Sequence, residues 1–182
     1  VGSFLSKALL PLIALPILLM LRTPSQTQAE AVADSGRTVL QLLAMPRYLL
    51  AVAAGVVSYG VMAFVMTAAP VAMVNHGHSV DNAALGIQWH LLAMFGPSFF
   101  TGRLMVRYGK ERVTAVGMVL LAASGVVALG GLGLSHFWGS LALLGIGWNF
   151  SFIGATAMVT DCHTPAERSK AQGMNDFFVF AA

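Results

Sequence analysis

The chain alternates long apolar stretches with short polar segments, which is the pattern of a protein that crosses a membrane several times. The apolar stretches lack the period-two alternation of β-strands and run beyond about ten residues, so helices are expected rather than a barrel. The predicted fold class is therefore all-α, a polytopic membrane helix bundle. The predicted spans are Ala8–Leu21, Tyr48–Met73, Ala83–Met105, Val113–Leu134 and Phe137–Thr160, followed by a last helix that becomes apolar at Ala171.

Local signals indicate where several helices begin. Residues 38–45 are expected to form a short interfacial helix, and Asn75–Ser79 a turn-rich loop. Asp81 is a candidate N-cap for the third span, because its side chain can accept a hydrogen bond from a free backbone N–H. Thr164 and Glu167 have the spacing of a capping box and enclose a proline, which predicts the start of the last helix.

Composition supports a membrane environment. Only 9% of the residues are charged and 57% are hydrophobic, whereas soluble domains average about 25% charged residues. The lipid bilayer is therefore an expected partner. The formal net charge of +3 does not indicate nucleic-acid binding, because the basic residues flank apolar spans. The single cysteine, Cys162, allows no internal disulfide.

The distribution of positive charge predicts the orientation of the chain. Nine of the ten Lys and Arg residues fall on one side of the predicted path across the membrane, and the opposite loops, Val74–Asn82 and Ser135–His136, contain none. The positive-inside rule makes the basic side cytoplasmic. The nine residues are Arg22, Arg37, Arg47, Arg103, Arg107, Lys110, Arg112, Arg168 and Lys170.

Polar side chains within the spans are the candidates for a binding site. Such groups are costly in a membrane and usually face a protein interior or a watery cavity. The first and fourth spans carry no ionisable or amide side chain in their apolar stretches and are expected to face lipid. The candidate substrate contacts are Tyr59, Gln88, His90, Trp148 and Asn149.

Structural roles stay open for the same kinds of residue. Asn149 can bond a neighbouring helix, because the small residues of the segment 145–151 allow close approach. His90 can handle protons or can be a satisfied structural histidine. Asp176, the one carboxylate within an apolar stretch, can relay protons or pair with a basic residue in the missing part of the protein. Pairing is preferred, because Asp176 is expected near the cytoplasmic end of its helix.

Enzyme chemistry has little support in the sequence. The pairs His76 with His78 and Asp161 with His163 provide too few spaced ligands for a zinc site. No glycine-rich loop precedes a Lys-Ser or Lys-Thr pair, so no nucleotide-binding loop is expected. We therefore expect no metal, no cofactor and no catalytic residues.

The stretch Gly102-Arg-Leu-Met-Val-Arg-Tyr-Gly-Lys-Glu-Arg112 carries four basic residues between two apolar spans and resembles a signature of the major facilitator superfamily. The family loop reads Gly, three residues, Asp, a basic residue, any residue, Gly and two basic residues. The matching positions are Gly102, Arg107, Gly109 and Lys110, whereas Val106 replaces the Asp, Glu111 replaces the last basic position and Arg112 restores a charge one place later. A degenerate loop of this kind is typical of the second half of the family fold, where it acts in conformational change.

The resemblance implies most of the C-terminal half of a twelve-helix transporter, from about helix six to the start of helix eleven. It implies a transmembrane helix at 1–22 that ends the N-terminal half, a central cytoplasmic linker at 23–46, and a truncated C-terminal transmembrane half at 47–182. The missing N-terminal half of the same chain is then a partner. The short segments 88–90, 147–149 and 172–176 also resemble a bacterial subgroup of drug- and metabolite-type members, which implies the bacterial cytoplasmic membrane.

The implied function is secondary active transport of a small organic solute by alternating access, with protons as the coupling ion. The Met and aromatic content favours an amphipathic organic solute over a sugar or a simple ion. Two other classes stay open: a membrane sensor with a transporter-like fold, and a membrane-embedded enzyme or assembly factor.

Overall fold

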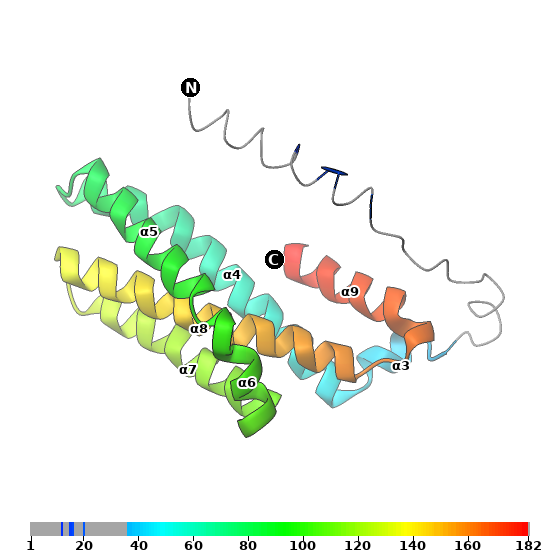
Figure 1. The fold of residues 1–182 in the computed structure, drawn as a ribbon. Coiled ribbons are helices and arrows are strands. Elements are labelled where there is room, and N and C mark those ends of the chain that lie inside the picture. The colour runs from blue at the N-terminus through cyan, green and yellow to red at the C-terminus, as the bar shows by residue number, and fades with distance from the viewer. Residues whose placement is uncertain (1–11, 13–14, 17–19, 21–35, 182) are drawn as a thin grey trace. The chain divides into compact units, whose positions relative to one another are not determined.

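The computed structural model describes residues 36–181 together with residues 12, 15, 16 and 20 (Figure 1). The chain divides into two units, Val1–Ser35 and Gly36–Ala182, and the description below concerns the second. Apart from those four isolated positions, the predicted first span and the linker before Gly36 lie outside the described residues. Residues 36–181 are helical and contain no strand, which confirms the all-α fold class.

Eight helical elements follow one another along the described unit. They are α3 (Val39–Leu43), α4 (Pro46–Asn75), α5 (Val80–Phe95), α6 (Ser98–Tyr108), α7 (Lys110–Leu129), α8 (Leu134–Asp161), the 3-10 turn η1 (Pro165–Glu167) and α9 (Arg168–Ala181).

Capping residues begin the helices at both ends of this unit. The predicted interfacial helix is present as α3, which starts with a capping box between Thr38 and Gln41. Pro46 stands at the first position of α4, where its missing N–H costs nothing. The predicted capping box of Thr164 and Glu167 is also present and leads through η1 into α9.

Three of the described helices, α4, α7 and α8, are long and apolar enough to cross a membrane on their own. The predicted third span is not a single helix. It is broken at Gly96 and Pro97 into α5 and α6, and Figure 1 shows α6 leaving α5 at an angle. Pro97 lacks a backbone N–H and its ring clashes with the carbonyl group four residues earlier, which disfavours a continuous helix at this point.

Two further helix ends differ from the predictions. Ser79, rather than Asp81, caps α5, because the Ser79 hydroxyl accepts a hydrogen bond from the Asn82 N–H. The helix predicted to continue to Leu134 ends at Leu129, where the glycine-rich segment 130–133 begins. Glycine gains much conformational freedom outside a helix, so a run of glycines favours a turn.

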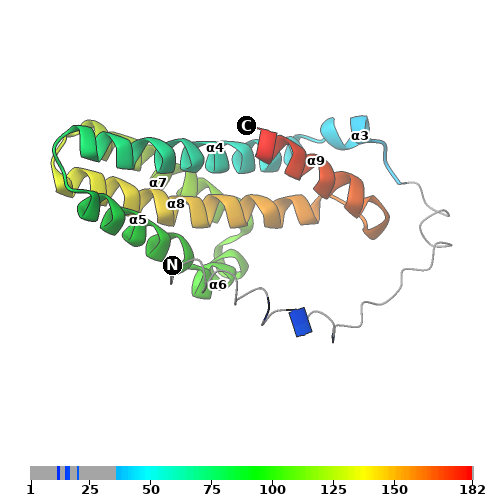
Figure 2. The same cartoon turned by 90° about the horizontal axis from the view of Figure 1, so that it is seen from above.

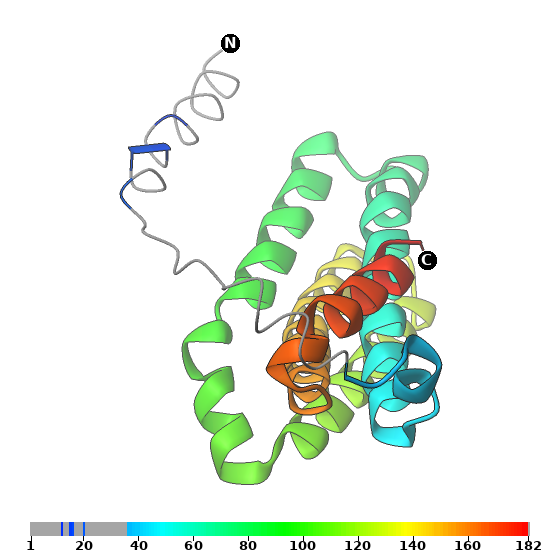
Figure 3. The same ribbon diagram turned by 90° about the vertical axis from the view of Figure 1, so that its right-hand side faces the viewer.

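The helix α8 is the centre of the described unit. It packs against α7, α5 and α4, and α9 lies along α4. Figures 2 and 3 show α4, α5 and α7 running beside α8 on different sides. Small residues make these contacts close: a Cβ on Gly145 would lie 2.6 Å from the His90 carbonyl oxygen of α5, and a Cβ on Gly147 would lie 2.9 Å from the Leu121 nitrogen of α7. The predicted close approach along the segment 145–151 is confirmed.

Candidate substrate-binding site

Asn149 lies fully buried on α8 and bonds to groups on both sides of the break between α5 and α6. Its Nδ2 donates to the Met94 carbonyl oxygen at 2.7 Å and to the Ser98 Oγ at 2.7 Å. Its Oδ1 accepts from the Thr101 hydroxyl at 2.6 Å. Protein groups therefore satisfy the amide, which supports the interhelical role over direct contact with a solute.

His90 is fully buried where α5 packs on α8. Its Nδ1 lies 2.9 Å from the Leu141 carbonyl oxygen, so Nδ1 carries a proton and donates it. Its Nε2 is buried and has no hydrogen-bond partner among the described residues. Because an unpaired buried polar atom is costly, Nε2 is a point at which a donor from outside the described residues would be stabilising.

Aromatic rings from α4, α8 and α9 gather on one side of α8. We call Tyr59, Trp148, Phe152 and Phe180 the aromatic cluster. Trp148 stacks on Phe152, with ring centroids 4.7 Å apart and planes at 13°. Tyr59 lies 6.3 Å from Phe152 and meets Phe180 edge-on at 5.1 Å. The Trp148 Nε1–H is buried and has no acceptor among the described residues, so the cluster combines flat apolar faces with an unused donor.

The structure brings together Tyr59 and Trp148, which the sequence had singled out, and adds two residues that it had not. The i, i+4 spacing of Trp148 and Phe152 places both rings on one face of a helix and was a usable signal. No local signal could reveal Phe180, because its contact joins residues 121 positions apart and depends on how α9 packs.

Two other predicted residues lie away from these groups. Gln88 is exposed on α5 and is two positions from the buried His90, so it lies on a different face of that helix. Asp176 is exposed on α9, and among the described residues its Oδ1 accepts a hydrogen bond from the Asn175 Nδ2 at 3.2 Å. The five proposed substrate contacts thus do not form one continuous surface within the described unit.

The basic stretch 102–112 is not a loop, which corrects the prediction. Residues 102–108 end α6, Lys110 starts α7, and Gly109 alone separates the two helices. Gly109 has φ +91°, a conformation that other residues rarely adopt. Gly109, the second glycine of the family pattern, is therefore the hinge between α6 and α7.

Ion pairs join α4, α7 and α8 beside this hinge. The Lys110 Nζ lies 2.6 Å from an Asp161 carboxylate oxygen, and the Arg47 guanidinium lies 2.6 Å from Glu111 and 3.6 Å from Asp161. Of the matching positions in the pattern, Lys110 has a carboxylate partner in the described structure, whereas Arg107 stacks over the Tyr108 ring at 5.3 Å.

An ion pair between the partly exposed Arg37 and the buried Glu167 connects the segment before α3 to the start of α9. Glu167 is 2% exposed. Its Oε1 accepts from the Arg37 backbone N–H at 2.7 Å and from Nε at 2.8 Å, and its Oε2 accepts from Nη2 at 2.7 Å. The Arg37 hydrogen bonds, together with one from the Thr164 backbone N–H, hold the pKa of the Glu167 carboxyl far below its ordinary range. The sequence marked Glu167 as a capping residue, but its partner 130 positions earlier has no local signal.

No three His, Cys, Asp or Glu side chains within the described residues are grouped so that they could hold a metal ion. The orphan polar atoms of the site are the nitrogen of His90 and the N–H of Trp148, which suit hydrogen bonding to an organic ligand.

Comparison with known proteins identifies the family. The sequence model of the Major Facilitator Superfamily matches residues 2–182, which is nearly the whole chain. The chain belongs to the major facilitator superfamily. The resemblance first seen in the stretch 102–112 is thus confirmed, and the helices above are those of an integral, multi-pass membrane protein.

Within the superfamily, the chain is 66% identical over 180 residues to the riboflavin transporter RfnT of Brucella anthropi. The aligned region covers 98% of this chain and 45% of that relative. Two uncharacterised MFS-type transporters of Bacillus subtilis are also similar. YddS is 40% identical over 118 residues, which cover 64% of this chain and 27% of YddS. YdeG is 38% identical over 121 residues, which cover 65% of this chain and 28% of YdeG. The chain spans less than half the length of each of these superfamily members. No solved structure matches the chain.

Proposed function

We propose that this chain forms most of the C-terminal half of a secondary active transporter that moves riboflavin, or a closely similar planar heteroaromatic solute, across the bacterial cytoplasmic membrane. The observation that carries the proposal is the 66% identity, over 98% of the chain, to a protein named as a riboflavin transporter. The proposal includes alternating access, by rocking of the two halves around a central site, and proton coupling.

The aromatic cluster supports this choice of solute. A planar ring system gains most from flat aromatic faces, and the stacked pair of Trp148 and Phe152 offers such a face on its outer side. Tyr59 brings a third ring from another helix. The unused Trp148 Nε1–H and the unpaired His90 Nε2 are polar groups that a ring with carbonyl and N–H groups could engage after a small rearrangement. These features favour a planar heteroaromatic solute over a sugar or a simple ion.

In this proposal Tyr59 and Trp148 stack on the solute, and His90 supplies an acceptor. Gln88 reaches the solute from the exposed face of α5, which would lie toward the N-terminal half. Asn149 holds the α5–α6 break and shapes the cavity indirectly. Asp176 contributes to proton coupling or pairs with a basic residue of the N-terminal half. The ion pair between Lys110 and Asp161, beside the Gly109 hinge, opens and closes as the halves rock.

Transport in proteoliposomes tests the proposal. The full-length protein is expected to accumulate riboflavin when a proton gradient is imposed, and to do so less when the gradient is collapsed. Tyr59→Ala and Trp148→Ala are each expected to raise KM by roughly two- to twelvefold, since an aromatic stacking pair contributes about 0.5–1.5 kcal/mol. Phe64→Ala on α4 is the matched control, because this ring is exposed and lies outside the cluster.

Three results would count against the proposal. Absence of riboflavin binding and flux by correctly folded protein would reject riboflavin as the solute. Flux that ignores the proton gradient would reject the coupling. An equal rise in KM for Phe64→Ala would remove the aromatic cluster from the site while leaving transport itself intact.

A further inference from the structure

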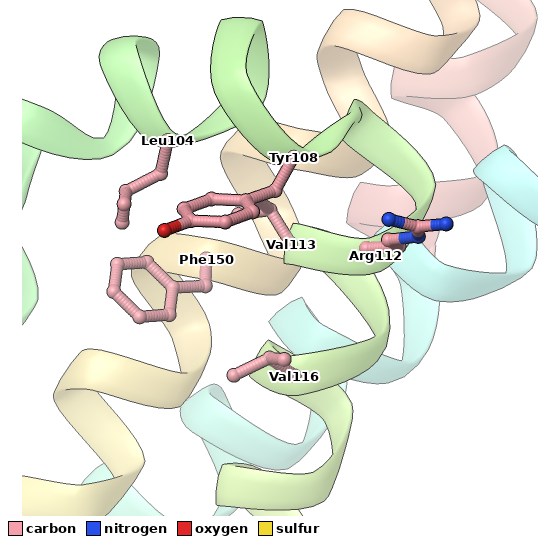
Figure 4. Close-up of a pocket in the computed structure, with 6 residues that line it drawn as sticks. All are labelled: Leu104, Tyr108, Arg112, Val113, Val116 and Phe150. Carbon is pink, nitrogen blue, oxygen red and sulfur yellow. The ribbon is translucent and has the colours of Figure 1, made fainter.

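A cavity of about 340 Å³ lies between α6, α7 and α8, next to the Gly109 hinge (Figure 4). Its volume is in the range of ligand sites, roughly 300–1,000 Å³. Phe150, its wall on α8, is offset by two positions from both Trp148 and Phe152, so the cavity and the aromatic cluster lie on opposite faces of α8. The six lining residues are Leu104, Tyr108, Arg112, Val113, Val116 and Phe150.

The wall of this cavity suits a hydrocarbon chain. Leu104, Val113, Val116 and Phe150 are apolar, and none of the lining side chains is a carboxylate or an amide that could orient a polar solute. Val116 is 51% exposed on the described unit, so the cavity opens outward rather than into the helix bundle. An aliphatic chain entering from the surface would cover these side chains.

Two arginines lie beside the cavity. In Figure 4 the Arg112 guanidinium points away from the Tyr108 hydroxyl, so its aliphatic stem lines the wall and its charge lies at the rim. The Arg107 guanidinium lies 5.3 Å from the centroid of the Tyr108 ring. In the described part of the chain neither arginine has a carboxylate partner, whereas Lys110 and Arg47 both do. The rim is therefore complementary to an anion.

The cavity extends along α7 from a charged end into an apolar part. Val116 lies six positions after Lys110 along α7, which is roughly 9 Å at the helical rise per residue. The cavity thus begins at the charged end of a membrane-spanning helix and extends into its apolar part. A phospholipid at the edge of a bilayer has its phosphate and its acyl chain in the same order.

We propose that this cavity holds one acyl chain of an anionic phospholipid, whose phosphate pairs with Arg112 and Arg107. Basic pockets between membrane helices bind such headgroups. The lipid contacts both α6 and α7 and so steadies the two helices on either side of the Gly109 hinge. This site is separate from the proposed solute site and does not depend on which solute is transported.

Lipid titration of the purified full-length protein, followed by native mass spectrometry, tests the site with phosphatidylglycerol as the probe. Arg112→Gln is expected to weaken binding of the tightest lipid about fivefold, since a basic residue near the surface contributes about 1 kcal/mol. Arg112→Lys is expected to restore most of it. Val116→Trp fills the cavity without changing its charge and is expected to abolish the same binding event.

Matched controls distinguish this site from general attraction. Arg168→Gln removes an exposed charge at the start of α9, and Val119→Trp adds the same bulk to an exposed position on α7 outside the cavity. Both are expected to bind like the unmodified protein. Phosphatidylethanolamine, which has no net charge, is expected to bind at least fivefold more weakly, and soluble glycerol phosphate is not expected to compete.

The proposal is overturned if both cavity variants retain full binding, or if the two controls lose it equally. Competition by glycerol phosphate would show a phosphate site without an acyl chain and would also overturn it. A fall in melting temperature for Val116→Trp in lipid-free detergent, without any change in lipid binding, would show that another segment of the protein fills the cavity.

Discussion

Asn149 shows how one buried polar side chain can decide local structure in a membrane protein. Its three hydrogen bonds reach groups on both sides of the α5–α6 break, where Pro97 removes a normal helical bond. The amide of α8 therefore fixes the position of α6 relative to α5. Asn149 was a candidate substrate contact in the sequence, and in the structure its side chain bonds to the residues around the break between α5 and α6.

Replacing Asn149 by Leu should destabilise the protein rather than weaken solute affinity. The change leaves the Met94 carbonyl and the Ser98 and Thr101 hydroxyls without this partner, at a cost of about 2 kcal/mol. Thermal unfolding in detergent should show the loss, with KM for the solute within twofold of the unmodified value. Thr156→Val is the control, because that exposed hydroxyl bonds only the Phe152 carbonyl of its own helix. A normal melting temperature with a strongly raised KM would make Asn149 a solute ligand instead.

The Arg37–Glu167 pair predicts a pH dependence. Because the folded-state pKa of Glu167 is lowered, its contribution to stability is complete above the ordinary carboxyl pKa of about 4.3. It is lost progressively as the pH falls from there through the folded-state pKa, because the unfolded chain then binds a proton that the folded protein does not. Glu167→Gln should have a lower melting temperature than the unmodified protein, by a difference that stays constant from about pH 5 to about pH 8. This difference in melting temperature should narrow in more acidic buffer.

Glu111→Gln serves as the comparison for that experiment. Its pair with Arg47 is about half exposed at both side chains, 54% and 52%, and exposed pairs contribute little. A margin for Glu167→Gln that stays unchanged in acid would mean that the buried carboxylate is not the stabilising species.

At the scale of elements, glycine and proline determine the architecture more than hydrophobicity does. Gly145 and Gly147 let α8 approach α5 and α7 closely enough for backbone contact. Pro97 and Gly109 divide what would be one apolar run and one basic loop into α5, α6 and α7. The positions of the breaks then create the cavity beside Arg112.

Filling a glycine at a helix contact should separate the helices that it joins. Gly147→Leu would place its Cβ 2.9 Å from the Leu121 nitrogen, too close for any side chain, and the movement needed should cost about 1–3 kcal/mol. Gly125→Leu on α7 is the matched control, because nothing lies within 4 Å of its Cβ position. The yield of monodisperse protein and its melting temperature should fall for the first variant and not for the second. Equal behaviour of both would show that α7 and α8 are not closely packed.

For the whole molecule, the basic segments define one side of the membrane in the proposed topology. The turn at residues 76–79 and the start of α9 lie at opposite ends of membrane-crossing helices in that arrangement.

Burial raises the pKa of the Cys162 thiol, so this native cysteine should stay unreactive at neutral pH.

Cysteine labelling in intact cells can therefore test the orientation. His76→Cys should react with a membrane-impermeant maleimide added outside, whereas Ser169→Cys should react only after the cells are permeabilised. Both positions are exposed in the described unit, so access through the membrane is the variable. The reverse pattern would place the basic segments outside and contradict the positive-inside assignment.

Hydropathy and local signals in the sequence determined the helical fold class, the approximate positions of the long apolar helices α4, α7 and α8, the capping box of Thr164 and Glu167, and the family. These follow from interactions between near neighbours and from the cost of burying charge in a bilayer, so they can be read along the chain. The same information was misleading at residues 96–97, where proline outweighed hydropathy, and at the stretch 102–112, where glycine left a hinge and not a loop.

Only the tertiary structure decided which polar residues meet. The amide of Asn149 and the carboxylate of Glu167 are satisfied by partners tens to more than a hundred positions away, and Phe180 joins the aromatic cluster through the packing of α9. Such contacts depend on the helix faces that small residues bring together, and periodicity within one helix does not specify the neighbouring helix. The sequence thus determined that this protein spans the membrane as a member of a transporter family, and helix packing decided where its aromatic cluster and its outward-opening cavity lie.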